Sequence, residues 1–476
     1  MYVSFSISTT TTDWCDTGHV TIDILPDDIL LEIFRFCQVD GLIEFGVTWE
    51  WEMLVHVCRR WRRLVFSLPR YLDLRLVCTR GTRVKEMLGT WPSIPIIILD
   101  WNELAWTQPI SNIVAALGHS DRVYGIRLGD LTDFQLERFT AATQKRFPAL
   151  TFLELGSHDE RVQALPLEFL GGSAPCLRIA RLHGIPCPAL PHLLFFSRDL
   201  IELRLLDIPV NGYVSPMAMA AGLSRSTRLQ NLSIEFRSLK SHLDRTNQFP
   251  RPQRHVVLPA LTHFCFRGVG EYLEDFVARI HAPFLDHIDI TFSNPLIFHL
   301  PQLSQFINRT ETLREFKQAD VIFGSDDVTI TLRSPGRAVY LMMRISSSKL
   351  GRQVSSLAQV CSRLLPLISC VERLDLDEDK RPKLGWLNDI DAALWMRFFQ
   401  SFTAVRTLRL SNEPGSLASR ALREITGETA KEVLPALRNL LLEDYWPISL
   451  IQEAIEPFLA ARRHSIYAID VHRWEG

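Results

Sequence analysis

Two series of apolar residues at helical spacing occupy the N-terminal part of the chain. Pro26, Asp27 and Asp28 open the first series. They suit a helix start because proline needs no N–H partner in the first turn and acidic groups favour the positive end of the helix dipole. We predict a helix from there to about Cys37, and a second helical stretch, divisible into two, that ends before Pro69. The apolar members are Leu25, Ile29, Leu30, Ile33, Phe34 and Cys37, then Met53, Leu54, Val57, Cys58, Trp61, Leu64 and Val65.

The apolar face of the first predicted helix is too wide for so short an element unless both of its sides are covered. A module of about fifty residues buries too little surface to be comfortably stable with that much apolar area. We therefore expect a partner or the following domain to complete its core, which is typical of a docking module.

A second pattern, apolar-x-x-apolar-x-apolar, recurs from about residue 90 onward. Its alternating last positions predict a short strand with one buried face, and segments such as 190–196 and 271–280 predict the helices that return the chain. The first seven copies are separated by 27, 27, 23, 29, 32 and 24 residues, close to the roughly 20 to 29 residues of leucine-rich repeats. They begin at Val123, Leu150, Leu177, Leu200, Leu229, Leu261 and Leu285, and later copies begin at Val371, Val405 and Leu437.

The repeats depart from the regular leucine-rich pattern after each strand. Gly156, Leu206 and Ser411 stand where the consensus asparagine is expected, so we expect an irregular array without a continuous asparagine ladder. Between residues 326 and 345 the pattern changes to two strand-like runs around Ser334, Pro335 and Gly336, which predicts a hairpin that interrupts the repeats.

The composition argues against proteins that bind nucleic acid or membrane surfaces through their overall charge. The 476 residues are 47% hydrophobic and 22% charged, as in folded proteins, and the formal net charge of -2 provides no global field for nucleic acid or an anionic membrane surface. The nine cysteines are dispersed, which favours a reducing compartment, cytoplasmic or nuclear. The longest apolar runs, 94–99 and 190–196, are too short to cross a bilayer, and residues 1–20 are expected to form a disordered tail.

Motifs for catalysis or metal binding are not apparent. Gly171, Gly172 and Ser173 lack the lysine and the spacing of a phosphate loop and predict a turn between repeats. The densest carboxylate group, at 375, 377 and 379, lacks the glycine turn and closing glutamate of a calcium loop, so we interpret it as a solvated strand end. We expect no catalytic residue, no metal and no cofactor, and hence no enzyme.

The N-terminal series resembles an F-box. Leu25-Pro26-Asp27-Asp28-Ile29-Leu30-Leu31-Glu32-Ile33-Phe34 is similar to its opening, and Val57-Cys58-Arg59-Arg60-Trp61-Arg62-Arg63-Leu64 to its second block. The continuation over 67–79, with Trp91 and Pro92, is similar to F-box proteins common in basidiomycete fungi. The chain departs from the family pattern at Asp28, where glutamate is usual, at Tyr71, where tryptophan is frequent, and in the long segment 38–50.

The resemblance implies the following architecture and partners. We expect an α/β protein with a small all-α F-box module at 21–75, followed by an irregular leucine-rich-repeat-like α/β solenoid at 76–476. F-boxes bind a Skp-family adaptor and, through it, a cullin, so the chain is expected to recruit an unidentified protein substrate to an SCF-type cullin-RING ubiquitin ligase. The implied adaptor-binding residues are Leu25, Pro26, Ile29, Leu30, Ile33, Phe34, Val57, Cys58 and Trp61.

Several alternatives remain open at this level. The repeats could bind a structural or regulatory partner that is not degraded, and some of the nine positions are expected to be core rather than interface. The arginines at 59, 60, 62 and 63 could form a nucleic-acid or import patch, although the solvated face of a helix is the commoner arrangement. Strand alternation predicts exposed specificity positions at Glu154, Arg178, Arg181, Glu202, Arg204, Asn231, Ser233, His263, Cys265, Asp286, His287, Asp289, Arg406 and Arg409.

Overall fold

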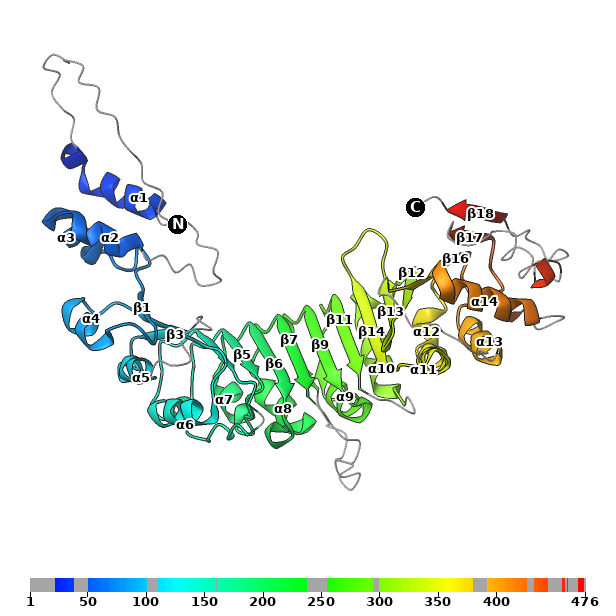
Figure 1. The fold of residues 1–476 in the computed structure, drawn as a ribbon, viewed down its shortest axis with the longest axis horizontal. Helices are drawn as coiled ribbons and strands as arrows, with labels where there is room; N and C mark the ends of the chain where they lie inside the picture. The colour runs from blue at the N-terminus through cyan, green and yellow to red at the C-terminus, as the bar shows by residue number, and fades with distance from the viewer. Residues whose placement is uncertain are drawn as a thin grey trace, which may run out of the picture. The chain divides into compact units, whose positions relative to one another are not determined.

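The computed structural model describes residues 22–37, 50–100, 110–159, 161–237, 255–293, 299–379, 392–425, 432–443, 456–458, 460 and 470–474, shown as coloured ribbon in Figure 1. The tail expected at 1–20 lies outside these residues. The chain divides into two compact units, residues 1–77 with 86–95, here called the helical unit, and residues 78–85 with 96–476, here called the sheet unit. The sequence predicts a boundary after residue 75, whereas the helical unit also includes 86–95.

The helical unit contains three helices where the sequence predicts them: α1 (Asp27–Cys37), α2 (Glu50–Val57) and α3 (Arg59–Ser67). The second apolar series divides at Cys58, whose extended backbone ends α2 and whose Sγ accepts a hydrogen bond from the Trp61 N–H group at 3.4 Å. Leu30, Val55 and Val65, one from each helix, are fully buried together in this unit.

A large and mostly parallel sheet confirms the α/β class. Its sixteen described strands follow the order β1-β2-β3-β4-β5-β6-β7-β9-β11-β14-β13-β12-β15-β16-β17-β18, and β8 with β10 forms a separate pair. The strands are β1 (Leu76–Cys78), β2 (Ile96–Asp100), β3 (Val123–Leu128), β4 (Phe152–Gly156), β5 (Ile179–His183), β6 (Glu202–Ile208), β7 (Asn231–Phe236), β8 (Val256–Val257), β9 (His263–Gly268), β10 (Ile280–His281), β11 (His287–Phe292), β12 (Gln318–Phe323), β13 (Asp327–Arg333), β14 (Tyr340–Ser346), β15 (Arg373–Glu378), β16 (Thr407–Leu410), β17 (Asn439–Glu443) and β18 (Asp470–Trp474).

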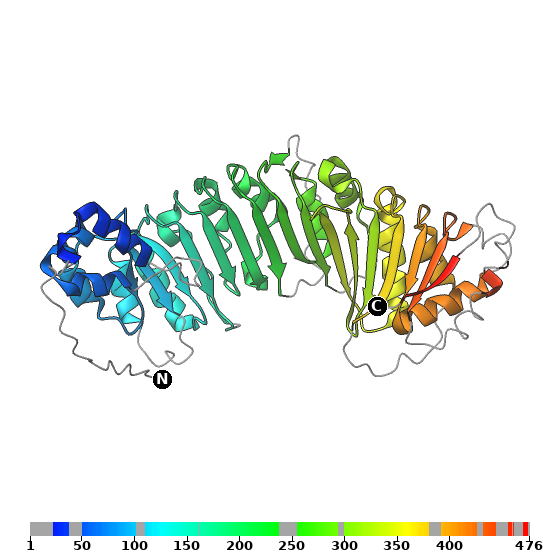
Figure 2. The same cartoon turned by 90° about the horizontal axis from the view of Figure 1, so that it is seen from above.

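Helices follow most strands and cover one face of the sheet. In Figures 1 and 2 helices α7 to α9 lie on one side of β5 to β11, and no described helix of the sheet unit covers the other side. The remaining helices are α4 (Val84–Thr90), α5 (Ser111–Leu117), α6 (Asp133–Ala142), α7 (Leu190–Phe196), α8 (Pro216–Leu223), α9 (Gly270–Val277), α10 (Pro301–Arg309), α11 (Leu350–Arg363), α12 (Leu365–Ile368), α13 (Ala392–Gln400) and α14 (Asn412–Glu424), with 3-10 turns at Ile22–Ile24, Phe169–Gly172, Val210–Gly212 and Glu311–Leu313.

A ladder of backbone carbonyls connects the residues that precede successive strands. The Thr151 carbonyl, for example, accepts the N–H groups of both Arg178 and Ile179, at 2.8 and 3.1 Å. Each such carbonyl receives two donors from the next repeat, so backbone hydrogen bonds fix the starts of β5, β6, β7, β9, β11, β15, β16 and β17. The same arrangement recurs at the carbonyls of Arg178, Ile201, Gln230, Thr262, Lys317, Glu372 and Arg406.

The sheet changes its order at β12 to β14. β13 pairs antiparallel with both β12 and β14, and β12 precedes the segment 326–345 in which the sequence predicts a hairpin. β14 is parallel to β11, and β12 is parallel to β15, so one reversed strand separates two parallel arrays. Buried Gln353 of α11 donates to the carbonyls of Gly324 and Ser347, at 2.9 and 2.6 Å, and thereby fixes the loops at the ends of this hairpin.

Gly184, directly after β5, is required by its backbone conformation. Its φ is +65°, and a Cβ atom there would lie 2.1 Å from the Ser157 carbonyl oxygen. The left-handed conformation and the close approach to the end of β4 both exclude a side chain.

We expect Gly184→Ala to lower the free energy of unfolding by about 3 kcal/mol, because the methyl group must displace the Ser157 backbone. Urea unfolding of the full chain, followed by circular dichroism, measures this change as a lower midpoint. Gly351→Ala in α11, where an added Cβ meets nothing within 4 Å, is the matched control and should keep or slightly raise the midpoint. Equal midpoints for the two variants would contradict the expectation.

Candidate functional site

The apolar surface of α1 is divided between two environments. Leu30 and Phe34 are buried inside the helical unit, at 0% and 1% exposure, whereas Ile29 and Phe36 are 44% and 86% exposed. Residues three, four or seven apart share one face of a helix, so Pro26, Ile29 and half-buried Ile33 form an apolar strip beside the buried one. The helical unit therefore buries only about half of the wide apolar face of α1.

The nine predicted adaptor-binding residues fall into three groups. Leu30 and Phe34 are core residues, so their side chains are not available to a partner. Leu25, Ile33, Cys58 and Trp61 are half-buried, and Pro26, Ile29 and Val57 are exposed. Trp61 packs on Phe34 with ring centroids 4.7 Å apart, so it serves the core as well as the surface.

Arg60 holds the junction of α2 and α3 against the start of α1. Its Nη2 donates to the Leu25 carbonyl and to Asp27 Oδ1, both at 2.6 Å, and its Nε donates to the same carboxylate at 3.0 Å. Arg62 Nε donates to the Val55 carbonyl at 2.9 Å. Arg59, Arg62 and Arg63 are exposed, in agreement with the interpretation as a solvated face, whereas Arg60 is half-buried and its hydrogen bonds connect α3 to the start of α1.

An aromatic cluster that the sequence analysis misses completes the helical unit. Trp51 of α2 is almost fully buried, and its Nε1 donates to the Arg75 carbonyl at 3.0 Å. Its ring lies 5.6 Å from that of Trp91 and 6.1 Å from that of Phe66. Trp91 lies well beyond the predicted end of the module at residue 75. The helical pattern of the module therefore does not predict that Trp91 packs in its core.

The uncovered face of the sheet carries most of the predicted specificity positions. Glu202, however, is only 7% exposed, because arginines from its own strand and from β5 cover it. Arg178, Asp286 and Arg406 lie directly before strands, in the carbonyl ladder or beside it, rather than on strands. The positions confirmed on strands and at least partly exposed are Glu154, Arg181, Arg204, Asn231, Ser233, His263, Cys265, His287, Asp289 and Arg409.

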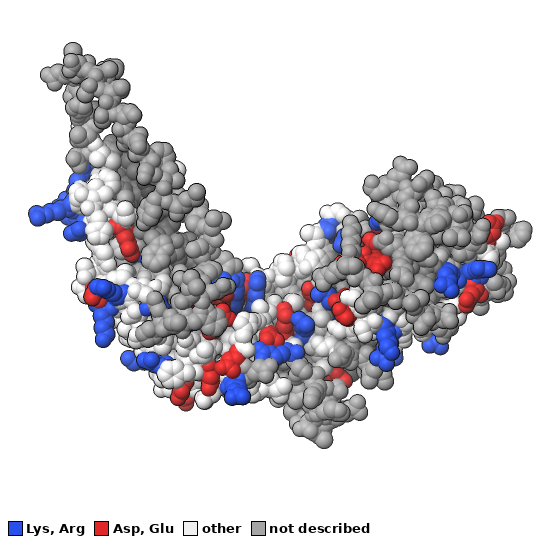
Figure 3. Space-filling model, viewed as in Figure 1, with Lys and Arg blue, Asp and Glu red and all other residues white. Residues whose placement is uncertain are grey.

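At one end of this face, over β3 to β6, charges of opposite sign neutralise one another. Arg127 Nε lies 3.1 Å from Glu154, and Arg181 contacts both Glu154 and Glu202, at 3.4 and 2.6 Å. Arg204 Nε lies 2.9 Å from the same Glu202 carboxylate. On the side of the molecule seen in Figure 3, which has the view of Figure 1, basic and acidic side chains are also interspersed.

At the centre of the face, over β7 to β14, two carboxylates flank a thiol. The strand register places Ser233, Cys265 and Asp289 side by side, and Glu235 Oε1 accepts from Cys265 Sγ at 3.7 Å. Burial raises the pKa of Asp289 above its usual range, and the Glu235 charge raises it further while Arg344 opposes the shift. Burial and the same two carboxylates raise the pKa of Cys265 to about 12, so its sulfur is a thiol at neutral pH.

Three aromatic side chains border these carboxylates. The imidazoles of His263 and His287 stack, 4.2 Å apart and 3° from parallel, and Tyr340 meets His287 edge-on at 4.8 Å. Burial, followed by the neighbouring His287, lowers the pKa of His263, so this ring stays neutral at physiological pH. Glu235 and Tyr340 are absent from the predicted positions, although extending the alternation of β7 by one step locates Glu235.

Of the carboxylates at 375, 377 and 379, only the first is buried, and the other two are half-buried. Asp375 is 7% exposed and accepts from Arg373 Nε and Nη2, at 2.9 and 3.0 Å, so the interpretation as a solvated strand end is wrong for this residue. Within the described part of the chain, no group of three or more potential ligands is arranged to hold a metal ion. Gly171 and Gly172 lie in a turn with positive φ, as predicted.

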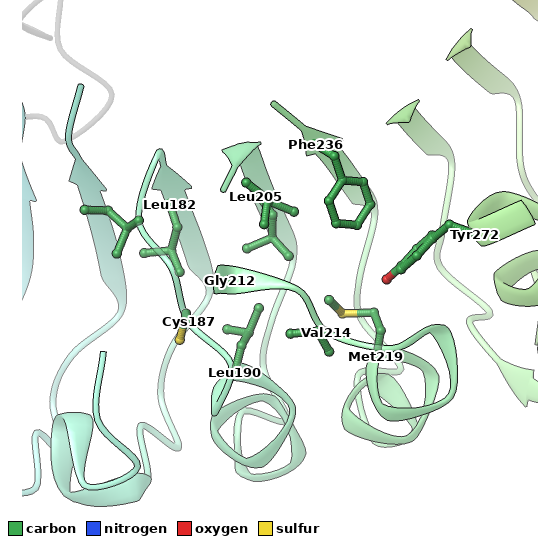
Figure 4. Close-up of a pocket in the computed structure, with 11 residues that line it drawn as sticks. Leu182, Cys187, Leu190, Leu205, Gly212, Val214, Met219, Phe236 and Tyr272 are labelled. Atoms are coloured by element: carbon green, nitrogen blue, oxygen red, sulfur yellow. The ribbon is translucent and has the colours of Figure 1, made fainter. Parts of the chain in front are cut away.

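A small cavity lies between strands β5 to β7 and the helices beneath them (Figure 4). Leu182, Leu205 and Phe236 line it from the strands, and Met219 and Tyr272 from the helices. The buried Tyr272 hydroxyl has no hydrogen-bond partner among the described residues. Because the lining is otherwise apolar, the cavity lacks the several polar groups that a polar ligand or catalysis requires.

Comparisons with known proteins give no family for the chain: no family model matches it, and no curated protein sequence matches it significantly. None of the described helices combines the length and hydropathy that a bilayer crossing requires.

We expect Trp91→Ala to destabilise the helical unit by about 2 kcal/mol, because Trp51 and Phe66 lose an aromatic neighbour. Amide hydrogen exchange of α2 and α3 in the full chain measures this as faster exchange. Phe36→Ala is the control, since that ring is 86% exposed and its loss should leave exchange unchanged. Unchanged exchange in Trp91→Ala would show that residues 86–95 are not part of this core.

We expect Asp289→Asn to stabilise the folded chain at neutral pH. Burial favours the protonated form of Asp289 in the folded state, so its charge costs stability above the folded-state pKa. The gain should be full above that pKa, shrink as the pH falls through it, and vanish below the unfolded value of about 3.9. Thermal unfolding across this pH range measures it, and a variant that is less stable at pH 7 would show that the carboxylate is favourably paired.

Proposed function

We propose that this chain is a non-catalytic substrate-recognition subunit of an SCF-type cullin-RING ubiquitin ligase. The carrying observation is the exposed apolar strip of α1, formed by Pro26, Ile29 and Ile33, which the helical unit leaves uncovered. In this proposal the strip and exposed Val57 bind a Skp-family adaptor, which connects the chain to a cullin. The F-box resemblance of these two segments supports the assignment.

Arg60 supports a single adaptor-binding surface. Its hydrogen bonds join the start of α1 to the residues just after Val57, so the exposed parts of both F-box-like segments are brought near one another. Interfaces concentrate their free energy in a few apolar anchors, and Ile29 and Val57 are the exposed ones in these segments. The core residues Leu30 and Phe34 are assigned only to positioning this surface.

The array of strands has the role of binding the protein substrate in this proposal. An uncovered sheet face with ten exposed or half-exposed predicted positions is suited to recognising a protein surface. The mechanism is proximity: a substrate held on the sheet gains a high effective concentration near the conjugating enzyme, without a reactive group in this chain. A reducing location, cytoplasmic or nuclear, agrees with the free cysteines of the described residues.

The adaptor contact is tested with Ile29→Glu combined with Val57→Glu, measured by titration against a purified fungal Skp-family adaptor. We expect the affinity to fall at least about 30-fold, because two apolar anchors worth about 2 kcal/mol together are replaced by charges. Trp61 is avoided because its ring packs on Phe34 and its loss would disturb the core.

The control is Phe134→Glu combined with Val210→Glu, which adds the same two negative charges at side chains of the sheet unit that are each 65% exposed. It should bind the adaptor as the wild type does. Circular dichroism should show both variants folded. A wild type that does not bind, or a double variant that binds equally well, would reject the adaptor-binding proposal and favour a purely structural role for the helical unit.

A further inference from the structure

The edge of the sheet unit at which β4 to β7 begin is basic. Six basic residues and one acidic residue occupy the segments that connect a helix to each of these strands, which are 143–151, 173–178, 197–201 and 224–230. All six basic side chains are exposed, and together they are called the basic strip: Lys145, Arg146, Arg178, Arg198, Arg225 and Arg228. At the opposite edge, the loops after β3 and β4 carry Asp130, Asp159 and Glu168. Charges of the two signs are therefore segregated to the two edges of these repeats.

The carbonyl ladder places the four segments of the basic strip side by side. The Thr151 carbonyl accepts the Arg178 N–H group at 2.8 Å, the Arg178 carbonyl accepts that of Ile201 at 2.7 Å, and the Ile201 carbonyl accepts that of Gln230 at 2.8 Å. Neighbouring strands lie about 4.8 Å apart, so the four segments span about 15 Å. An extended chain of about four or five residues has this length.

The positive charge of the basic strip is mostly uncompensated. Arg228 Nη1 lies 3.1 Å from Asp199 Oδ1. The other five members have no ion pair within 4 Å in the described part of the chain. Like charges held on neighbouring repeats repel one another, and an anionic partner offsets that repulsion.

An aromatic pair at the end of α7 lies within the basic strip. Arg225 Cζ lies over the Phe195 ring, 4.0 Å from its centre, so a ring of the protein itself positions this guanidinium. The adjacent Phe196 is 40% exposed, and its ring centroid lies 5.2 Å from that of His192. A ligand of the strip therefore meets an exposed apolar ring as well as positive charge.

We propose that the basic strip binds a short acidic segment of the recruited protein, with one apolar side chain of that segment on Phe196. The inference deepens the proposed function and rests on it for the identity of the partner as a protein. The strip is complementary to aspartate and glutamate side chains in charge, and to a few extended residues in length. A long polyanion such as nucleic acid is disfavoured, because the net charge of -2 and the paired charges of the adjoining sheet face attract none beyond the strip.

The test uses the full chain and a fluorescein-labelled peptide of four glutamates around one phenylalanine, followed by fluorescence anisotropy. We expect saturable binding to the wild type, and at least about tenfold weaker binding to Arg178→Gln with Arg198→Gln. A peptide with glutamine in place of glutamate should not bind measurably. Phe196→Ala should weaken the binding of the original peptide, but not that of a peptide with glycine in place of phenylalanine.

The control for charge is Arg161→Gln with Arg352→Gln, which removes two exposed basic groups from the loop after β4 and from helix α11. It should bind the acidic peptide as the wild type does. Equal binding by both double variants, or an absence of saturable binding to the wild type, would overturn the proposal. So would an oligothymidylate of equal charge that binds the wild type more tightly than the peptide and loses binding in the Arg178 and Arg198 variant. Because adaptor binding is measured on Ile29 and Val57 of the helical unit, either proposal can fail while the other stands.

Discussion

The ladder of shared backbone carbonyls is the interaction on which the sheet unit depends. Eight carbonyls, each directly before a strand, accept two N–H groups of the next repeat, and most of these residues follow one another at the spacing of the apolar pattern. Since the backbone makes these bonds, the residue at each position is free to vary, from Thr151 to Arg178 to Gln230. This explains how the array continues without the asparagine ladder whose absence the sequence shows.

Much of the fold could be predicted because short-range patterns determine it. The helix Asp27–Cys37 and strands such as Asn231–Phe236 follow directly from apolar spacing. The order β11-β14-β13-β12 could not be predicted, because the hairpin pattern identifies the strands but not their neighbours in the sheet. The packing of Trp91 against Trp51 could not be predicted either, because the two residues are far apart in the sequence and belong to no common helical or strand pattern.

The candidate sites show the same limit. Sequence alone identifies the apolar width of α1 but not its division into buried Leu30 and Phe34 and exposed Ile29. On the sheet, the alternation of side chains locates Asp289 correctly, but it does not tell whether an arginine neutralises the carboxylate. Glu202 is covered by two arginines, whereas Asp289 has none within ion-pair distance among the described residues. Which charges are compensated depends on the register between strands, and that information is absent from any single strand.

The reversed strand β13 also has a consequence for synthesis of the chain on the ribosome. Up to β11 the strands of the large sheet join its edge in the order in which they leave the ribosome, and only β8 and β10 pair apart from it. β12 cannot join in this order, since the partner of β11 is β14, which ends at Ser346. Growth of the sheet must pause until about fifty more residues have emerged, and during that interval the edge of β11 is open to chaperones or to wrong partners.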